Sequence, residues 1–253
     1  MTSIIHALTY NIHKGFTPAN IRFRLPKMCE AIAEVDSDIV FLQEVQGAHK
    51  RKEKRIEDWP DPNQFEYLAK ELGPHYVYGK NAIYQSGHHG NAILSKYPFA
   101  ASENISLSHV TRASRGLLHG IITIPEFNKP IHSICIHLGL FKTERQEQLI
   151  ALSERIALSV PQNEPLIIAG DFNDWREVAS EHLEQELGLS EVFKTMDGEH
   201  AKTFPAWSPK LPTDRIYFRG LNLVDGKCLK QKHWKTLSDH LPLHATFSLL
   251  PEA

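Results

Sequence analysis

Short apolar runs recur along the whole chain and predict strands. Several are nearly continuous and rich in β-branched residues, which is typical of strands covered on both faces. Others alternate: in HLPLHATFSL, which begins at residue 240, Leu241, Leu243 and Ala245 fall on one face. The expected strands are 4–12, 38–45, 90–95, 117–124, 131–138, 166–169, 215–218 and 240–249.

Apolar residues at helical spacing lie between some of these runs. They predict helices over 25–35, 64–72, 143–160 and 178–187, and Gly73 and Gly188 end the second and the last of them. The sequence contains no long linker, low-complexity segment or fixed-period repeat, so we expect one domain over residues 1–253. Strands outnumber helices, and both span the chain. This favours an α/β domain with more than one sheet.

Composition and charge narrow the range of partners. The 253 residues are 42% hydrophobic and 23% charged, as is usual for a soluble globular protein. The formal net charge of −2 gives the chain as a whole no attraction for nucleic acid or an anionic membrane. A basic cluster lies at residues 50–55, but Glu53 interrupts it and Glu57 follows it. The pattern favours a solvated loop over a polyanion-binding patch.

The cysteines and the N-terminal segment indicate a reducing compartment. Cys29, Cys135 and Cys228 are far apart and odd in number, so they match neither a disulfide framework nor a CxxC metal site. The first 15 residues lack the basic and apolar regions of a signal peptide. No apolar stretch approaches the ~20 residues of a membrane span. We therefore expect a cytoplasmic protein without a membrane span, and a monomer.

The candidate chemistry lies where the expected strands begin or end. Taken singly, each polar residue there has an ordinary interpretation as a turn former, a cap, a local salt bridge or a hydrogen-bonded core histidine. Taken together, they would form one oxygen-rich site with two imidazoles, because α/β proteins place their sites at the ends of strands. The residues are Asn11, Glu44, His137, Asp171, Asn173, Asp214, Asp239 and His240.

These ligand types indicate metal-assisted phosphoryl chemistry. Carboxylate and amide oxygens without cysteine suit Mg²⁺, with Mn²⁺ as the alternative, rather than structural zinc. Such a metal neutralises charge on a phosphate while a carboxylate activates water. The sequence has no GxxxxGK[ST] phosphate loop and no GxSxG elbow, so it gives no support to a nucleoside triphosphatase or a serine hydrolase.

With these motifs, the chain resembles the endonuclease/exonuclease/phosphatase superfamily and its compact bacterial members. The similarity runs in the family's order through TYNIHKG at 9–15, FLQEV at 41–45, GNAILSKYP at 90–98, IHLG at 136–139, AGDFND at 169–174, TDRIYF at 213–218 and LSDHLPL at 237–243. The resemblance implies a four-layer α/β/β/α sandwich in which two mixed β-sheets pack together.

The resemblance also implies roles for the metal-binding and water-activating residues. Glu44 would be the principal Mg²⁺ ligand, and Asn11 and Asp239 would complete the metal's near shell, partly through water. Asp171 would activate the attacking water, and Asn173 would orient that water or the phosphate. The attack on phosphorus would be in line, without a covalent intermediate.

On the phosphate, the resemblance implies two imidazoles on opposite sides. His240 would contact the phosphate, with Asp214 fixing its tautomer and orientation, and His137 would contact it from the other side. Asn91 is a candidate partner that orients His137 or meets the substrate. Arg115 is a candidate phosphate contact, and a structural surface arginine is the alternative interpretation. One departure from the family pattern is His13, which stands where exonuclease III-type members carry an acid.

Three functions compete at this stage. The first is a Mg²⁺-dependent phosphodiesterase for a small molecule or a lipid headgroup, favoured by the near-neutral charge. The second is an endonuclease or exonuclease that uses the 50–55 cluster to hold DNA or RNA. The third is a binding module without activity, which the completeness of the residue set disfavours.

Overall fold

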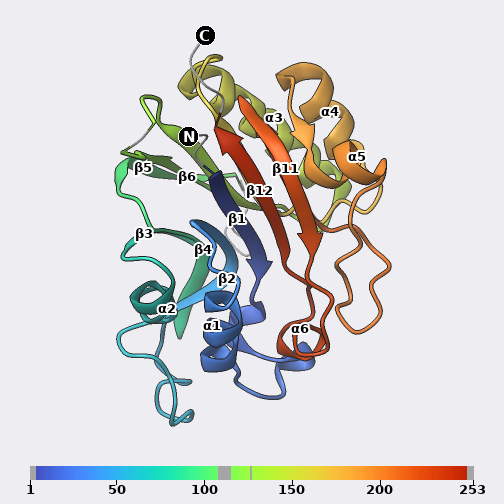
Figure 1. Cartoon of the computed structure of the whole chain (residues 1–253). Helices are drawn as coiled ribbons and strands as arrows, with labels where there is room; N and C mark the ends of the chain where they lie inside the picture. Colours follow the sequence, from blue (N-terminus) through green and yellow to red (C-terminus); the bar gives the residue numbers. More distant parts are fainter. Residues whose placement is uncertain (1–3, 108–114, 126, 250–253) are drawn as a thin grey trace.

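The computed structural model describes residues 4–107, 115–125 and 127–249, and within them the strands form two six-stranded sheets. The first sheet has the order β11-β12-β1-β2-β4-β3 (Figure 1). The second has the order β5-β6-β7-β8-β10-β9. The first comprises β1 (Ile4–Asn11), β2 (Ile39–His49), β3 (His75–Tyr84), β4 (Gly87–Ser95), β11 (Leu221–Cys228) and β12 (Leu243–Leu249). The second comprises β5 (Phe99–Ser106), β6 (Gly116–Ile122), β7 (Ile131–His137), β8 (Leu166–Asp171), β9 (Ser190–Glu191) and β10 (Asp214–Arg219).

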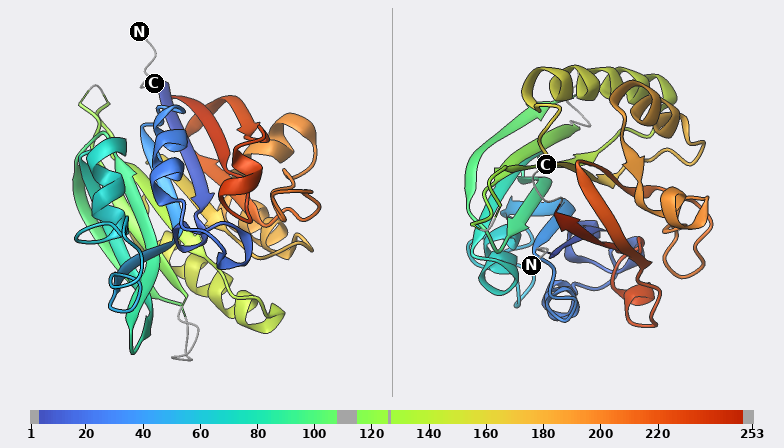
Figure 2. Two further views of the ribbon diagram at one scale, coloured as in Figure 1. Left: turned by 90° about the horizontal axis from the view of Figure 1, so that it is seen from below. Right: turned by 45° about the horizontal axis from the view of Figure 1, so that its top comes forward.

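The sheets pack face to face, and helices cover their outer faces. Phe41 and Phe247 of the first sheet and Ile167 and Phe218 of the second share one buried core. On the outer face of the first sheet lie α1 (Leu25–Ala33), α2 (Gln64–Leu72) and α6 (Trp234–Leu237); on that of the second lie α3 (Lys142–Ser159) and α4 (Val178–Leu187). Figure 2 shows α3 and α4 on the opposite side of the sandwich from α1 and α6. The expected four-layer α/β/β/α sandwich is confirmed.

Two parallel strand pairs bring the ends that carry polar residues together. β1 and β2 are parallel and connected through α1, and β7 and β8 are parallel and connected through α3, as parallel pairs require. Asp171 is directly opposite both His137 on β7 and Asp214 on β10. The register therefore places three candidate site residues side by side at one end of the second sheet.

Sequence analysis did not predict four of the strands, namely β3, β5, β9 and β11. It also did not predict the short helices α5 (Val192–Asp197) and α6 or the two 3₁₀ turns η1 (His13–Gly15) and η2 (Pro18–Asn20). The reason is clearest for β5, an edge strand whose sequence, FAASENIS, is mostly exposed. A strand with few buried side chains carries little apolar alternation for sequence analysis to detect. No helix in the described part of the chain is long and apolar enough to cross a membrane.

Candidate active site

Asp171 is the centre of the site and ends β8. Its Oδ2 atom lies 3.1 Å from Asn11 Nδ2, 3.4 Å from His137 Nε2 and 3.8 Å from His240 Nε2. Its Oδ1 atom accepts a hydrogen bond from the backbone N–H of Asn173 at 2.9 Å. All five residues are buried. The structure thus brings together the predicted base, the predicted water-orienting amide and both imidazoles.

Gly170 lets β8 approach β7 closely enough to form this arrangement. Its φ of +150° is rarely adopted by residues with a side chain, and a Cβ there would lie 2.0 Å from the carbonyl oxygen of Ile136. Only glycine therefore fits in front of Asp171 without displacing a strand.

His240 is held from behind by Asp214. Asp214 Oδ2 lies 2.8 Å from His240 Nδ1, 2.5 Å from the Thr203 hydroxyl and 2.9 Å from the Thr213 hydroxyl. The bond to Asp214 places the Nδ1 proton between the two side chains and leaves Nε2 facing Asp171. The Phe204 ring lies 5.0 Å from the imidazole ring and limits its rotation. Sequence analysis predicted Asp214 in this position but not the two threonines.

On the other side of Asp171, His137 meets Arg115. Arg115 NH1 donates to His137 Nε2 at 3.0 Å. Because arginine is only a donor, Nε2 must be the unprotonated nitrogen, and His137 is a neutral imidazole with its proton on Nδ1. Burial and the charge of Arg115 both hold the pKa of His137 well below its usual range. The cationic donor on this side is thus Arg115.

Asn91 lies near this pair. Its Nδ2 atom donates to the backbone carbonyls of Gly116 at 3.0 Å and Cys135 at 3.3 Å. The side chain lines a cavity of about 10 Å³ with Glu44, Arg115 and His137, among other residues. Its amide protons therefore tie β4 to the second sheet.

Glu44, Asp239 and Asn11 form a second group, next to the first. His13 Nδ1 lies 3.3 Å from Asp239 Oδ2 and 3.9 Å from Glu44 Oε2, so one imidazole stands between the two carboxylates. The Lys14 ammonium lies 2.6 Å from Glu44 Oε2. Glu44 has a φ of +58° at a break in the β2–β4 register, and such bulges redirect a side chain.

This second group fits the expected metal. Two carboxylates and an amide oxygen are the hard ligands that Mg²⁺ takes, and Glu44 and Asp239 both retain some solvent exposure. A different set, Asp171, Asp214 and His240, has one ligand atom from each residue within 4.8 Å of the others. There, Asp214 Oδ2 and His240 Nδ1 already bond to each other and to threonines. The Glu44 group is therefore the better candidate metal site.

Asp174, three residues after Asp171, has structural contacts. It is buried, and its Oδ2 atom accepts from the backbone N–H of Ala179 at 2.7 Å near the start of α4. The guanidinium of the fully buried Arg215 lies 3.5 Å from the same carboxylate. Asp174 thus fixes the loop that carries Asp171 and Asn173. The Nδ2 atom of Asn173 also donates to the carbonyl oxygen of Leu138 at 2.9 Å.

Comparisons with known proteins identify the family of this chain. The model of the endonuclease/exonuclease/phosphatase family matches residues 8–240, which include every residue of the two groups. This chain belongs to that family. The protein YbhP of Escherichia coli strain K12, itself uncharacterized, is 45% identical over 242 residues, which are 96% of this chain and 95% of YbhP.

Two solved structures share the fold. The endonuclease/exonuclease/phosphatase of Beutenbergia cavernae superposes with a TM-score of 0.79 at 20% identity, covering 97% of this chain and 72% of that one. The mannosyl-6-phosphatase of Bacteroides thetaiotaomicron superposes with a TM-score of 0.72 at 17% identity, covering 95% and 98%. Members of this family are hydrolases that act on phosphoesters.

The ionisable side chains of the two groups differ in the direction in which their pKa values are shifted. Burial raises the pKa of Asp171 to about 7, although the charge of His240 acts against it. Burial opposes ionisation of His240 too, but Asp214 and then Asp171 raise its pKa to about 10. Burial would also raise the pKa of Glu44, yet the charge and the hydrogen bond of Lys14 hold it well below the usual range. Glu44 is thus a carboxylate and His240 an imidazolium at neutral pH.

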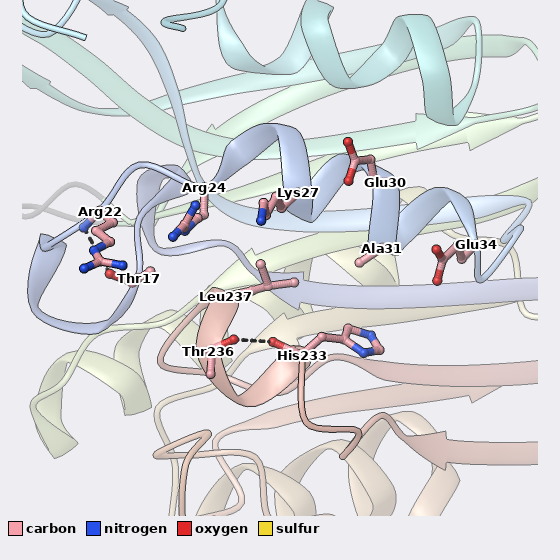
Figure 3. A pocket seen from close by; sticks show the side chains of 10 residues that line it. All are labelled: Thr17, Arg22, Arg24, Lys27, Glu30, Ala31, Glu34, His233, Thr236 and Leu237. Carbon is pink, nitrogen blue, oxygen red and sulfur yellow. Dashed lines mark hydrogen bonds between the residues drawn. The ribbon is translucent and has the colours of Figure 1, made fainter. Parts of the chain in front are cut away.

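A separate cavity of about 480 Å³ lies between α1 and α6, with Arg22, Arg24 and Lys27 on one side of it and His233 on the other (Figure 3). None of the predicted site residues lines it. Lys27 lies on α1, and Arg22 and Arg24 precede that helix; Arg22 and Lys27 are exposed, and Arg24 is half-buried. Four of the predicted site residues line the smaller cavity instead, namely Glu44, Asn91, Arg115 and His137.

Proposed function

We propose that this protein is a Mg²⁺-dependent phosphodiesterase that hydrolyses a small molecule or a lipid headgroup by attack of water on phosphorus. The observation that carries the proposal is the position of Asp171 Oδ2, which lies within 4 Å of Asn11, His137 and His240. A buried carboxylate among two imidazoles and an amide, next to two further carboxylates, suits a base that works beside a metal.

Asp171 receives the proton of the attacking water. Its burial makes the carboxylate a better base than a solvated aspartate, because desolvation disfavours the charged form. The hydrogen bonds from Asn11 Nδ2 and the backbone N–H of Asn173 fix the direction of its lone pairs. Proton transfer to a positioned carboxylate of this kind contributes roughly 10²- to 10⁴-fold to a rate.

His240 and Arg115 provide positive charge on two sides of the place where the phosphoryl group would lie. The imidazolium of His240 presents its Nε2–H, while Asp214 behind it stabilises the charge and fixes the ring. Arg115 is anchored on His137 and donates from the other side. Preorganised donors of this type stabilise the charge that develops on the phosphoryl oxygens.

Glu44, Asp239 and the Asn11 amide oxygen would hold the Mg²⁺ ion. When bound, the ion supplies a charge that neutralises a phosphoryl oxygen. The chain's own contribution is to keep Glu44 ionised through Lys14 and to keep Asp239 beside it through His13.

Exposed apolar side chains beside the site support a substrate with an apolar part. Leu140 and Phe141 follow β7 with 57% and 74% of their surface exposed, and Trp175 follows the Asp171 loop with 41% exposed. Loops at the ends of the catalytic strands are where such enzymes contact the rest of their substrate. The acyl chains next to a lipid headgroup, or the ring of an aromatic ester, would bring these side chains out of water.

A nuclease is the second candidate function. It is supported by Lys52, the member of the 50–55 cluster that lies within electrostatic range of Glu44. The other four basic residues of that cluster are exposed, as expected for a solvated loop.

Hydrolysis of bis-(p-nitrophenyl) phosphate with Mg²⁺ tests the proposal. We expect the wild type to release p-nitrophenol, and Asp171→Ala and His240→Ala to lose at least about 10²-fold in kcat. Phospholipid, single-stranded DNA, duplex DNA and RNA are assayed in parallel. Inactivity of the folded wild type on all of them with Mg²⁺ and with Mn²⁺ contradicts the proposal, and activity on nucleic acid alone selects the nuclease.

A further inference from the structure

Lys52 differs from the rest of the basic cluster because its side chain turns inward. Its Nζ atom donates to Gln46 Oε1 at 3.0 Å, and Gln46 is two residues beyond Glu44 on β2. The ammonium also lies 4.4 Å from the centre of the Phe16 ring and 5.7 Å from that of Trp59. A cation above two aromatic faces is held in place, and the bond to Gln46 uses one of the three N–H donors of the ammonium.

An aromatic frame fixes the position of this lysine. Phe16 packs on Phe23 with ring centres 5.3 Å apart, and Phe23 stacks on Trp59, also at 5.3 Å. His49 lies between Trp59 and Tyr84, at 6.2 Å and 5.7 Å. The frame therefore links the turn after Asn11, the 50–63 segment and the β3–β4 hairpin around one ammonium group.

Lys52 bonds the neutral side chain of Gln46 and forms no ion pair among the described residues, whereas Lys14 is paired. Lys14 pairs with Glu44 at 2.6 Å, and Lys52 lies within electrostatic range of both residues. Partial burial and the charge of Lys14 lower the pKa of Lys52 to about 8. An ammonium that is desolvated and beside a like charge gains from an incoming anion.

We propose that Lys52, with Lys14, forms a subsite for a second phosphate of the substrate, on the Glu44 side of the reacting phosphorus. The inference rests on the proposed function and refines it: the preferred phosphoester carries another phosphate on its organic group. In a nucleic acid, this is a neighbouring backbone phosphate, and in a small molecule it is a terminal phosphate. Arg115 and His240 are left for the reacting group.

Two matched substrates test the subsite. Thymidine 5′-(p-nitrophenyl phosphate) and its 3′-phosphorylated counterpart share the leaving group and differ by one phosphate. We expect the wild type to favour the 3′-phosphorylated substrate by about 10-fold or more in kcat/KM, the effect of one charge-assisted contact. Lys52→Met is expected to reduce this preference to within about twofold of unity, and Lys52→Arg to retain most of it.

Lys54→Met is the matched control, because it removes the same charge from the exposed side of the same loop. It is expected to keep the preference for the 3′-phosphorylated substrate. Equal kcat/KM for both substrates in the wild type, or an unchanged preference in Lys52→Met, overturns the subsite. The kcat/KM of wild type and Lys52→Met on a thymidine tetranucleotide identifies the source of the second phosphate. A lower kcat/KM of Lys52→Met on the tetranucleotide means that a backbone phosphate is accepted. A lower kcat/KM on the 3′-phosphorylated nucleotide alone means that the subsite takes a terminal phosphate.

A binding measurement separates the subsite from the reaction. Inorganic pyrophosphate is titrated calorimetrically into wild type, Lys52→Met and Lys54→Met without divalent metal, after thermal unfolding has shown that all three are folded. We expect Lys52→Met to bind about 10-fold more weakly than the other two. If the wild type hydrolyses neither nucleotide nor any substrate of the wider assay, the proposed function fails while this titration still decides the subsite. Equal binding by all three proteins, or none by the wild type, overturns it.

Discussion

The side-chain amide of Asn11 donates to the Asp171 carboxylate at 3.1 Å across 160 residues of sequence. Asn11 ends β1 of the first sheet, and Asp171 ends β8 of the second. This bond therefore joins the two sheets at the reaction centre. Asn11 Oδ1 also accepts from the His13 backbone N–H at 3.1 Å, so one amide orients both the base and the turn next to Glu44.

Replacing Asn11 by Asp should disable the base. The variant has no N–H to donate, and its carboxylate would face Asp171 at hydrogen-bonding distance. We expect kcat on bis-(p-nitrophenyl) phosphate to fall roughly 10- to 100-fold, which is the usual effect of losing a group that orients a functional ligand. The Asn11→Ala variant is the control, because it removes the donor without adding a charge. A kcat within twofold of the wild type in Asn11→Asp contradicts this account.

The two threonines behind Asp214 should affect catalysis without touching the substrate. Thr203 and Thr213 donate to the same Asp214 oxygen that holds His240. Thr203→Val keeps the shape but removes one donor, so we expect a several-fold loss in kcat with little change in KM. Thr203→Ser keeps the hydroxyl and should restore the rate. A change in KM alone would show that Thr203 acts on binding instead of on His240.

The sequence predicted the fold and the members of the site because their signals are local. The strands that fill the core between the sheets are apolar runs, and the motif residues stand at their ends. The exposed edge strand β5 has no apolar run. A residue whose role depends on a contact with a distant part of the sequence likewise has no local pattern that would identify it. Thr203 contacts Asp214 from a segment without regular structure, and threonine in a loop is unremarkable in a sequence.

Charge partners were equally hard to predict from the sequence. Asp174 is a common turn residue by type, yet the structure pairs it with Arg215, 41 residues away. Lys52 lies in a basic cluster whose sequence is typical of a solvated loop. Its contacts with Phe16 and Gln46, which the structure shows, distinguish it from the other basic residues of the cluster. Arg115 is the donor to His137, which required the register of β6 and β7 to be known. Such pairings depend on which strands become neighbours.

His244 should make the protein less stable in acid. It is 9% exposed, and burial followed by the charge of His6 lowers its pKa from 6.5 to about 4. A histidine whose pKa is lower in the folded protein binds its proton preferentially in the unfolded chain. The contribution of neutral His244 to the free energy of unfolding is therefore fully present above about pH 6.5. It is lost as the pH falls towards 4, and the loss is about 2 kcal/mol at pH 5.

Urea unfolding at pH 7 and pH 5 measures this effect. The loss of unfolding free energy between the two pH values should be about 2 kcal/mol smaller in His244→Phe than in the wild type. The exposed His233 on the outer helical layer is the control, and His233→Gln should lose as much as the wild type. Equal losses in all three proteins would show that His244 takes up its proton without unfolding.

Substitutions of Lys14 and of Glu44 should have opposite effects on the affinity for Mg²⁺. The Lys14 ammonium forms an ion pair with Glu44 Oε2 at 2.6 Å. A metal ion that binds this carboxylate therefore competes with Lys14. Glu44→Gln removes the charge that holds the metal, and we expect it to weaken Mg²⁺ binding at least about 10-fold. Lys14→Met removes the competitor and is expected to tighten binding severalfold, because the ion no longer displaces an ion pair.

Titration calorimetry with MgCl₂ at pH 7.5 measures both changes without a substrate. Lys70→Met, an exposed charge loss on α2, controls for the change in net charge and should bind Mg²⁺ as the wild type does. Weaker binding in Lys14→Met would mean that the lysine maintains Glu44 in its binding conformation. In that case its ion pair is part of the metal site, and the positive-φ backbone at Glu44 would be the feature that depends on it.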